Sequence, residues 1–277
     1  MSEIGKKLRL DRIIDRKTGK TVIIAFDHGF EHGPADFPPK VLDPKTVVKA
    51  ALQGGANGIM MHKGVAKYTA QEWVGKIPLI LKVTGRTRLM PEELAIQAHV
   101  ASVEDAVSLG ADGIAVTIYV GSNNEPKMLE DFGRVEAICR QLGMPILALM
   151  YPRGPSVKDR YNVEYVKYAA RLGAELGVDI IKTYYTGSPD TFREVVKSCH
   201  VPVVAAGGPR KETAKEALEM VREVMEAGAV GVTIGRNVWG HPNPVGMTRA
   251  IRKIVMQNAS VKEALKELRS IAKRKHG

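Results

Sequence analysis

A repeated pattern runs along most of this 277-residue chain: a helical stretch ends at a glycine, and a short apolar run follows it. Regular internal repetition is the signature of a fold built from one repeated unit. Three further apolar runs have proline as their second residue, and one more apolar run precedes all the others in the chain. Together they predict eight strands, at residues 21–26, 55–61, 77–81, 110–116, 144–149, 177–181, 201–205 and 228–234.

The runs are nearly continuous in Val, Ile, Leu and Ala, which is typical of strands covered on both faces, as in parallel sheets. Proline at the first residue of a strand is tolerated because no ladder donor is needed there. Glycines stand where helix ends favour a positive φ. The helical patterns between the runs cover residues 44–53, 103–109, 128–142, 163–176, 189–198, 211–227 and 244–258.

Eight alternating strand and helix units predict a single (β/α)8 TIM barrel. A doubly wound open sheet is the alternative, but its usual glycine-rich dinucleotide loop after the first strand is missing. The length fits two small domains or one large barrel, and no long Pro/Ser-rich linker divides the chain. We therefore expect one domain over residues 1–277, with its first strand from about residue 21 and a helical tail over 261–277.

The net charge of +11 favours anionic ligands. The aromatic residues are few and dispersed, and the one dense basic run is the tail 273–276, so we expect a phosphorylated small molecule rather than nucleic acid. With no apolar run of membrane-spanning length and no hydrophobic signal core, we expect a cytoplasmic protein with no membrane partner. Cys139 and Cys199 are too few for a disulfide framework, and we expect both to be buried apolar residues.

The active site of a TIM barrel lies at the carboxyl ends of its strands. Polar residues or paired glycines stand at every one of these predicted ends: Asp27, His28, His62, Lys63, Lys82, Thr117, Tyr119, Tyr151, Arg153, Lys182, Tyr184, Gly207, Gly208, Gly235 and Arg236.

Lys182 directly follows an apolar run, so its side chain is expected inside the barrel. Burial and a cation such as Lys82 or Arg153 would lower its pKa and supply the neutral amine that a nucleophile requires. An ammonium paired with a carboxylate at the barrel mouth is the alternative.

Asp27 ends the first strand and Tyr151 the fifth, so both could converge near Lys182. A carboxylate and a phenol suit the proton transfers of a carbonyl condensation. A capping aspartate and an interface tyrosine are the alternatives. Gly207, Gly208, Gly235 and Arg236 end the last two strands, where TIM barrels often bind phosphate, although glycine pairs are also ordinary turn residues.

Residues 28–32 match the H-x-x-E-H zinc pattern, which requires a helix so that the two histidines share one face. Because the segment follows a strand and contains Gly29, we expect no helix and no metal here. His62, His99, His200 and His241 have no partner at ligand spacing, and we expect them in surface or core positions.

Several stretches, in barrel order, resemble the archaeal-type class I fructose-bisphosphate aldolases, in the wider group of Schiff-base aldolases. They are residues 26–37, 151–154, 181–187, 206–209 and 235–237, and the resemblance extends from about residue 19 to 258. It implies an aldehyde-lyase that cleaves fructose 1,6-bisphosphate without a metal or cofactor.

The resemblance implies a role for each site residue. Lys182 would form the Schiff base, Tyr151 would be the acid/base and Asp27 would assist proton transfer. Gly207, Gly208, Gly235 and Arg236 would hold one phosphate and Arg153 the other, with Lys82 and His28 also contacting the substrate.

A close relative with the same lysine chemistry is 2-amino-3,7-dideoxy-D-threo-hept-6-ulosonate synthase, which condenses a sugar fragment with aspartate semialdehyde. Leu149, Met150 and residues 245–268 look more like this synthase, whereas residues 32–37, Lys82 and residues 117–119 look like the aldolase. A phosphosugar-binding barrel without activity and a metal aldolase using His28 and His32 are further alternatives. Aldolases of this type are commonly homo-oligomers, and we expect Trp73 and Trp239 to be exposed and available to interfaces.

Overall fold

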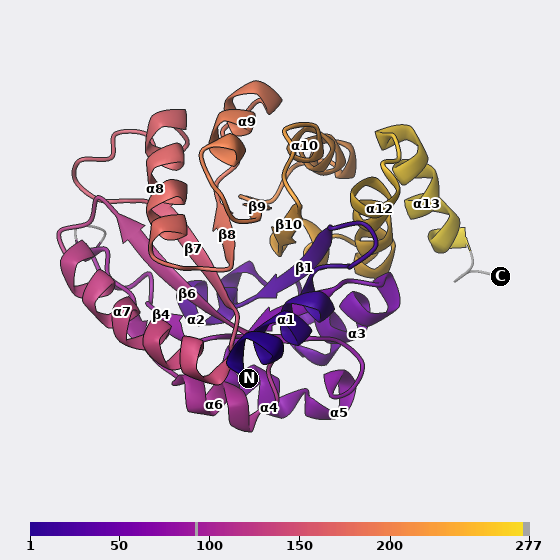
Figure 1. The fold of residues 1–277 in the computed structure, drawn as a ribbon. Helices are drawn as coiled ribbons and strands as arrows, with labels where there is room; N and C mark the ends of the chain where they lie inside the picture. The colour runs from indigo at the N-terminus through magenta and orange to yellow at the C-terminus, as the bar shows by residue number, and fades with distance from the viewer. Residues whose placement is uncertain (92–93, 274–277) are drawn as a thin grey trace.

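The computed structural model describes residues 1–91 and 94–273, and eight parallel strands close into a barrel in the order β1-β10-β9-β8-β7-β6-β3-β2 (Figure 1). The predicted TIM barrel is therefore confirmed, and each predicted run contributes one strand. The barrel strands are β1 (Thr21–Phe26), β2 (Gly58–Met61), β3 (Leu79–Lys82), β6 (Gly113–Val120), β7 (Ile146–Pro152), β8 (Ile180–Thr183), β9 (Val203–Ala206) and β10 (Gly231–Ile234).

Helices surround this barrel (Figure 1). The glycines Gly110, Gly143, Gly177 and Gly228, which end helical segments, all have positive φ as predicted. The helices that match predicted patterns are α3 (Lys45–Gly54), α6 (Val103–Ser108), α7 (Glu125–Leu142), α8 (Val163–Glu175), α9 (Pro189–Lys197), α10 (Ala214–Glu226) and α12 (Pro244–Gln257).

Helix α10 begins three residues later than predicted. Thr213 is its N-cap: the Thr213 side chain accepts from the backbone N–H of Glu216, and the Glu216 side chain accepts from that of Thr213. This reciprocal capping box satisfies two backbone donors that the first helical turn leaves unpaired. Residues 211–213 thus remain in the loop that follows β9.

The sequence pattern did not predict helix α1 (Ser2–Ile13), which closes the amino-terminal end of the barrel. Its Lys6 pairs with Asp179 at 3.1 Å and its Arg12 with Asp112 at 2.8 Å, and these two aspartates precede β8 and β6. Ile13 is 1% exposed and packs into the barrel interior. Helix α1 therefore plugs the end opposite to the one where the active site is expected.

The connection from β3 to β6 carries a second, two-stranded antiparallel sheet that was also not predicted. Strand β4 (Thr84–Gly85) pairs with β5 (Ala98–His99). Phe30 packs so closely on Gly85 that a Cβ there would lie 2.6 Å from the Phe30 ring. This contact ties the small sheet to the segment that follows β1.

That segment and the remaining connections are short helices. They are α2 (His28–His32), η1 (Gly33–Asp36), η2 (Pro39–Val41), α4 (Lys63–Tyr68), α5 (Ala70–Trp73) and α11 (Arg236–Trp239), and α13 (Val261–Lys273) packs on α12. The part of the expected tail beyond residue 273, including most of the basic run, lies outside the described residues.

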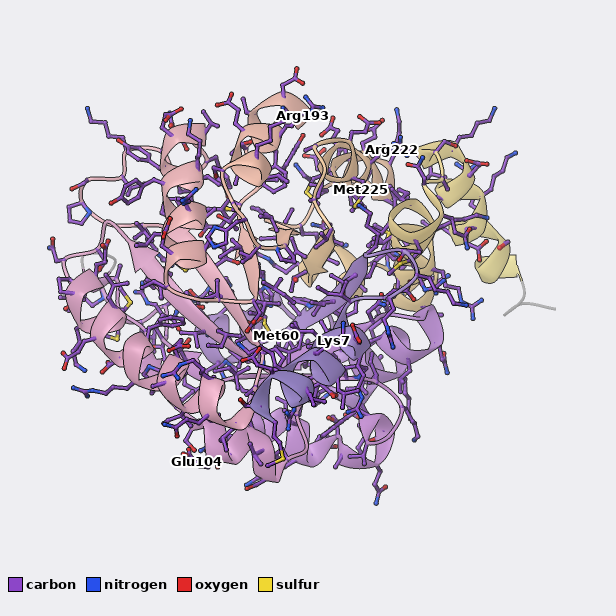
Figure 2. The ribbon with its side chains drawn as sticks, viewed as in Figure 1. Lys7, Met60, Glu104, Arg193, Arg222 and Met225 are labelled. Atoms are coloured by element: carbon purple, nitrogen blue, oxygen red, sulfur yellow. The ribbon has the colours of Figure 1, made fainter. Side chains whose placement is uncertain are left out.

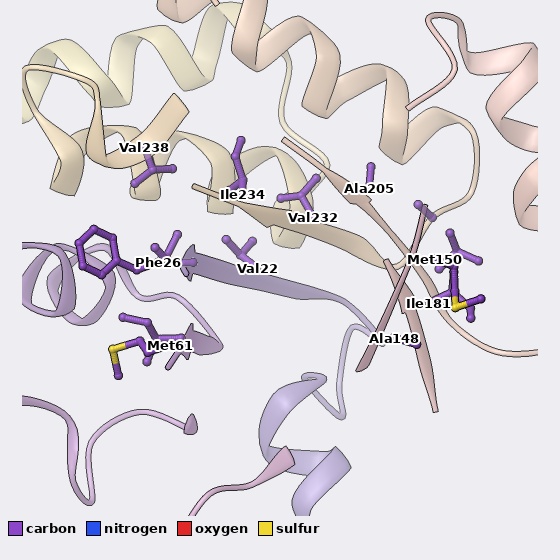
Figure 3. Close-up of a cluster of buried hydrophobic side chains, with 14 of the residues drawn as sticks. Val22, Phe26, Met61, Ala148, Met150, Ile181, Ala205, Val232, Ile234 and Val238 are labelled. Atoms are coloured by element: carbon purple, nitrogen blue, oxygen red, sulfur yellow. The ribbon is translucent and has the colours of Figure 1, made fainter. Parts of the chain in front are cut away.

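The larger hydrophobic core lies between the strands and the surrounding helices. It includes Val22, Phe26, Met61, Ile181 and Val232, which Figure 3 shows together. A second cluster, the interior cluster, fills the barrel between α1 and the strand ends, and it includes Met60, which lies near the centre of Figure 2. The charged Glu104 and Arg193 lie on outer helices in the same view.

The expectation that Trp73 and Trp239 are exposed is wrong, because they are 4% and 1% exposed. Each indole N–H finds a buried carbonyl, that of Trp73 at Ala66 and that of Trp239 at Ala25. A tryptophan whose N–H is satisfied inside the protein can be buried without a polar penalty. Cys139 is buried as predicted, but Cys199 is only half-buried. Among the described helices, none has the length and apolar character needed to span a membrane.

Candidate active site

A cavity of about 410 Å³ opens at the carboxyl ends of the barrel strands. Every strand of the barrel, or the loop that follows it, contributes at least one lining residue. The structure brings together here all ten residues to which the resemblance gave a role: Asp27, His28, Lys82, Tyr151, Arg153, Lys182, Gly207, Gly208, Gly235 and Arg236. Of the other polar residues predicted at strand ends, only Lys63 does not line the cavity.

Lys182 extends from β8 into the cavity and is 5% exposed. Burial lowers the pKa of its amine, because the charged form loses hydration inside the protein. The carboxylates of Asp27 and Glu31 act in the opposite direction. Arg236 adds positive charge that favours the neutral amine. The sequence predicted Lys82 or Arg153 in this role, and the charges of Lys82 and Lys182 do repel each other, since Lys182 lowers the pKa of Lys82. The net effect makes Lys182 a better nucleophile than an exposed lysine.

Asp27 directly follows β1 and faces positive groups. Burial acts to raise its pKa, but the contact with His28 and the charges of Lys182 and Lys82 outweigh burial and hold the pKa well below its usual range. The His28 Nδ1 lies 3.3 Å from the Asp27 Oδ1. Asp27 is therefore a carboxylate at neutral pH and a source of negative charge beside the Lys182 amine.

Lys82 is a second buried lysine, 3% exposed at the end of β3. Its Nζ donates to the carbonyl oxygen of Thr84 at 2.6 Å and also to the Thr84 hydroxyl, which accepts from the backbone N–H of Thr117. Burial lowers the pKa of Lys82 to about 8, although Asp27 and Glu31 oppose the shift. Two hydrogen bonds hold this amine in place.

Tyr151 lies in β7, and its ring stacks on that of Tyr184 with centroids 4.3 Å apart and planes 9° apart. Burial raises the pKa of Tyr151 well above its ordinary value, and neighbouring tyrosines and carboxylates act in the same direction. The phenol therefore keeps its proton at neutral pH. It can donate that proton to an oxygen leaving the substrate.

Glu31 was not predicted as a site residue, because in the sequence it stands out only as part of the H-x-x-E-H pattern. It lies 3.6 Å from Arg153 Nη1, and the Tyr119 hydroxyl donates to it at 3.4 Å. That hydroxyl accepts from Gln97 at 2.7 Å and from Arg153 at 3.2 Å. Its position four residues beyond Asp27, just after the first strand, was the available signal.

The last two strand ends form a cradle of backbone around the cavity. Gly208 has a φ of +64°. A Cβ at Gly207 would lie 2.4 Å from the Ile234 side chain, and a Cβ at Gly235 would lie 2.6 Å from the Ala25 carbonyl oxygen. Only glycine fits such approaches without a shift. Arg236 completes this side of the cavity with its guanidinium.

Asn237, for which no role was predicted, joins the two loops of the cradle. Its amide donates to the carbonyl oxygens of Gly207 at 2.7 Å and Pro209 at 3.1 Å, and its oxygen accepts from the N–H of Lys211 at 2.7 Å. One buried side chain thereby holds the loop after β9 against the start of α11.

The expectation that residues 28–32 are not helical is wrong, since they form α2. The rings of His28 and His32 lie 5.8 Å apart, but each faces its own carboxylate: Asp27 for His28 and Asp36, at 2.7 Å, for His32. Within residues 1–91 and 94–273, no three His, Cys, Asp or Glu side chains are grouped as a metal ion requires. His62, expected on the surface or in the core, instead lines the cavity, and burial lowers its pKa to about 4.

Comparisons with known proteins agree on one family. The model of the DeoC/LacD family aldolases matches residues 21–241. The class 1 fructose-bisphosphate aldolase of Thermoproteus tenax is 41% identical over 257 residues, which are 92% of this chain and 96% of that protein. The 2-amino-3,7-dideoxy-D-threo-hept-6-ulosonate synthase 1 of Archaeoglobus fulgidus is 38% identical over 262 residues, 95% of each protein.

A solved structure also matches closely. It is an archaeal fructose-1,6-bisphosphate aldolase whose catalytic lysine is covalently bound to the carbinolamine intermediate of the substrate. The TM-score is 0.86 at 39% sequence identity, and the match covers 91% of this chain and 99% of that one.

Proposed function

This chain belongs to the DeoC/LacD family of aldolases, and on that premise we propose that it is a class I fructose-bisphosphate aldolase. The enzyme cleaves fructose 1,6-bisphosphate to dihydroxyacetone phosphate and glyceraldehyde 3-phosphate through a Schiff base, and it catalyses the reverse condensation. The sequence resemblance to this family is confirmed by the 41% identity over nearly the whole chain.

The reaction begins at Lys182. Its neutral amine adds to the C2 carbonyl of the open-chain ketose, and a proton passes from nitrogen to oxygen to give the carbinolamine. The Tyr151 phenol then protonates the hydroxyl, which leaves as water, so that an iminium and a phenolate are formed. The Asp27 carboxylate lies where it stabilises the positive charge of the iminium.

Carbon–carbon cleavage uses the iminium as the electron acceptor. The Tyr151 phenolate takes the C4 hydroxyl proton, the C3–C4 bond breaks, and its electron pair moves into the iminium to give an enamine. Glyceraldehyde 3-phosphate leaves as the aldehyde. Tyr151 then protonates C3, and water adds to the new iminium with loss of its proton to the phenolate. Collapse of this carbinolamine releases dihydroxyacetone phosphate and the free amine.

The backbone cradle of Gly207, Gly208 and Gly235, with Arg236, suits one substrate phosphate, because close N–H groups and a guanidinium bind that anion well. Arg153, which follows β7 and contacts Glu31 and Tyr119, suits the second phosphate. Lys82 and His28 supply further polar contacts to the substrate.

The buried Lys182 with its lowered pKa, facing the Asp27 carboxylate, is the observation that carries the proposal. A coupled assay of fructose 1,6-bisphosphate cleavage with and without EDTA tests it. We expect equal turnover in both, because no step uses a metal. Activity that EDTA abolishes and a divalent metal restores would instead favour a metal aldolase using His28 and His32.

The synthase is the second candidate, since its relative is 38% identical. In Leu149 and Met150 this chain has no aromatic residue, whereas aldolases tend to carry one in this stretch; Leu149 lines the cavity and is the register partner of Lys182. Product analysis with fructose 1,6-bisphosphate alone and with aspartate semialdehyde separates the two candidates. Fast cleavage alone supports the aldolase, and turnover only with the semialdehyde supports the synthase.

We also propose that the enzyme is a cytoplasmic homo-oligomer in which residues 1–277 form one domain. With Trp73 and Trp239 buried, exposed aromatic candidates for an interface include Tyr165 and Tyr168 on α8, which are 37% and 66% exposed. Light scattering of the purified protein gives the oligomer mass, and a monomer at all concentrations would exclude this assembly.

A further inference from the structure

The stacked pair Tyr151 and Tyr184 stands directly above Lys182. Leu149 of β7 is in parallel register with Lys182 of β8, and the two tyrosines follow these residues by two positions each. Side chains two apart on a strand point to the same side. The rings therefore meet on the cavity side of the two strands, near the Lys182 amine, and all three side chains line the cavity.

The strand ends beneath this stack are tied together. Thr183 is fully buried, and its hydroxyl donates to the carbonyl oxygen of Met150 at 2.8 Å. This bond joins the residues immediately before Tyr184 and Tyr151, one position beyond the last paired residues of the two strands. It sets the spacing of the backbones from which the two rings project.

Tyr184 is also held from another direction. Tyr161, in the loop before α8, contacts it with ring centroids 5.3 Å apart and planes 56° apart. Tyr184 is half-buried, so its ring has a defined place between Tyr151 and this loop. Tyr151 thus stands against a fixed aromatic surface rather than against solvent.

We propose that Tyr184 is a positioning residue, whose stacked ring holds the Tyr151 phenol at the height and angle needed for proton transfer at the Lys182 adduct. The inference rests on the proposed role of Tyr151 as acid/base. Proton transfer requires the donor and acceptor to lie within hydrogen-bonding distance, and misplacement by about 1 Å costs on the order of 10²-fold in rate. Tyr184 acts through its ring, not through its hydroxyl.

Two substitutions at one position separate ring from hydroxyl. Tyr184→Phe keeps the stack, and we expect kcat within about threefold of wild type. Tyr184→Leu fills similar space without a flat ring, and we expect kcat to fall on the order of 10²-fold with little change in KM. Borohydride reduction with substrate over a long incubation should still trap the adduct on Lys182 in both variants, because the amine itself is untouched. The adduct should form more slowly in Tyr184→Leu, because Tyr151 also protonates the hydroxyl that leaves when the iminium forms.

Three results would overturn the inference: wild-type kcat in Tyr184→Leu, an equal loss in both variants, or no borohydride adduct in Tyr184→Leu alone even after a long incubation. The second would assign the chemistry to the Tyr184 hydroxyl, and the third would place its effect on Lys182. Thr183→Val serves if Tyr184→Leu does not fold. We expect this variant to lower kcat about tenfold with the adduct retained, and an unchanged kcat would contradict the proposal.

Tyr151→Phe separates this inference from the proposed function. An impaired Tyr151→Phe beside a fully active Tyr184→Leu would remove the positioning role and leave the acid/base assignment intact. A Tyr151→Phe variant as active as wild type would end both, because nothing would then need to be positioned.

Discussion

The two ends of the barrel interior differ sharply although the same strands build both. At the amino-terminal end, Ile13 of α1 closes a wholly apolar cluster to which β8 contributes Ile180. At the carboxyl end, β8 contributes Lys182, two residues further on and on the same side of the strand. One end gains stability from buried apolar surface, whereas the other places unfavourable buried charges where they can react.

Lys182→Met gives the largest expected effect, and it is confined to activity. Without an amine no Schiff base can form, so kcat/KM for fructose 1,6-bisphosphate should fall at least about 10⁴-fold. Asp27 keeps His28 and Lys82 as partners, so the thermal midpoint should not fall. A clear drop in the midpoint would show that the reactive end also stabilises the fold.

Asp27→Asn should lower kcat by roughly 10²–10³-fold, because the amide cannot balance the positive charge of the iminium. Steady-state kinetics and a melting curve measure the two effects together. Asp190→Asn, on the outer helix α9, is a control outside the cavity lining. A kcat for Asp27→Asn near that of wild type would show that Asp27 only caps the turn after β1.

Ile180→Ala reverses the pattern. Removing a buried aliphatic side chain from the interior cluster should cost about 2–5 kcal/mol of unfolding free energy. The kcat of the folded enzyme should change little, because the residue lies below the reacting groups. Urea unfolding and kinetics on the same preparation test this, and a large loss of kcat without a loss of stability would break the contrast between the two ends.

The pH dependence gives the smallest expected effect. Because burial lowers the pKa of Lys182, kcat/KM should rise with pH through a midpoint below the ordinary value for lysine, as the amine loses its proton. Arg236→Met removes a charge that lowers this pKa and should move the midpoint up. Asp27→Asn removes one that raises it and should move the midpoint down.

Arg88→Met is the matched control for these midpoints, since Arg88 lines the cavity but is not among the charges that shift Lys182. It should leave the midpoint unchanged. Midpoints that move together in all three variants would point to a general change of the cavity instead of these individual charges.

The carboxyl end was largely predictable from sequence, because parallel strands place their ends together and a polar residue after an apolar run is easily seen. In β8, Ile180 belongs to the apolar run and Lys182 is the polar residue that follows it. Glu31 and Asn237 were missed because their roles depend on loop geometry. The helicity of residues 28–32 was missed because a strand precedes them.

The amino-terminal end was harder to predict. Helix α1 buries mainly Ile13 and leaves the apolar Ile4 and Leu8 exposed, so its apolar residues do not mark one buried face in the sequence. What places it is tertiary: the pairs Lys6–Asp179 and Arg12–Asp112 and the fit of one isoleucine into the barrel. The burial of Trp239 likewise depends on a carbonyl partner distant in sequence, that of Ala25. The burial of Trp73 depends on how the local chain folds to bring the Ala66 carbonyl to its indole N–H.

Borohydride reduction in the presence of dihydroxyacetone phosphate, followed by peptide mapping, tests the central claim most directly. Lys82 provides an internal comparison, since it is equally buried, lines the same cavity and also has a lowered pKa. The account predicts one reduced adduct per chain, on Lys182. An adduct on Lys82, or none in an enzyme that still cleaves fructose 1,6-bisphosphate, would contradict it.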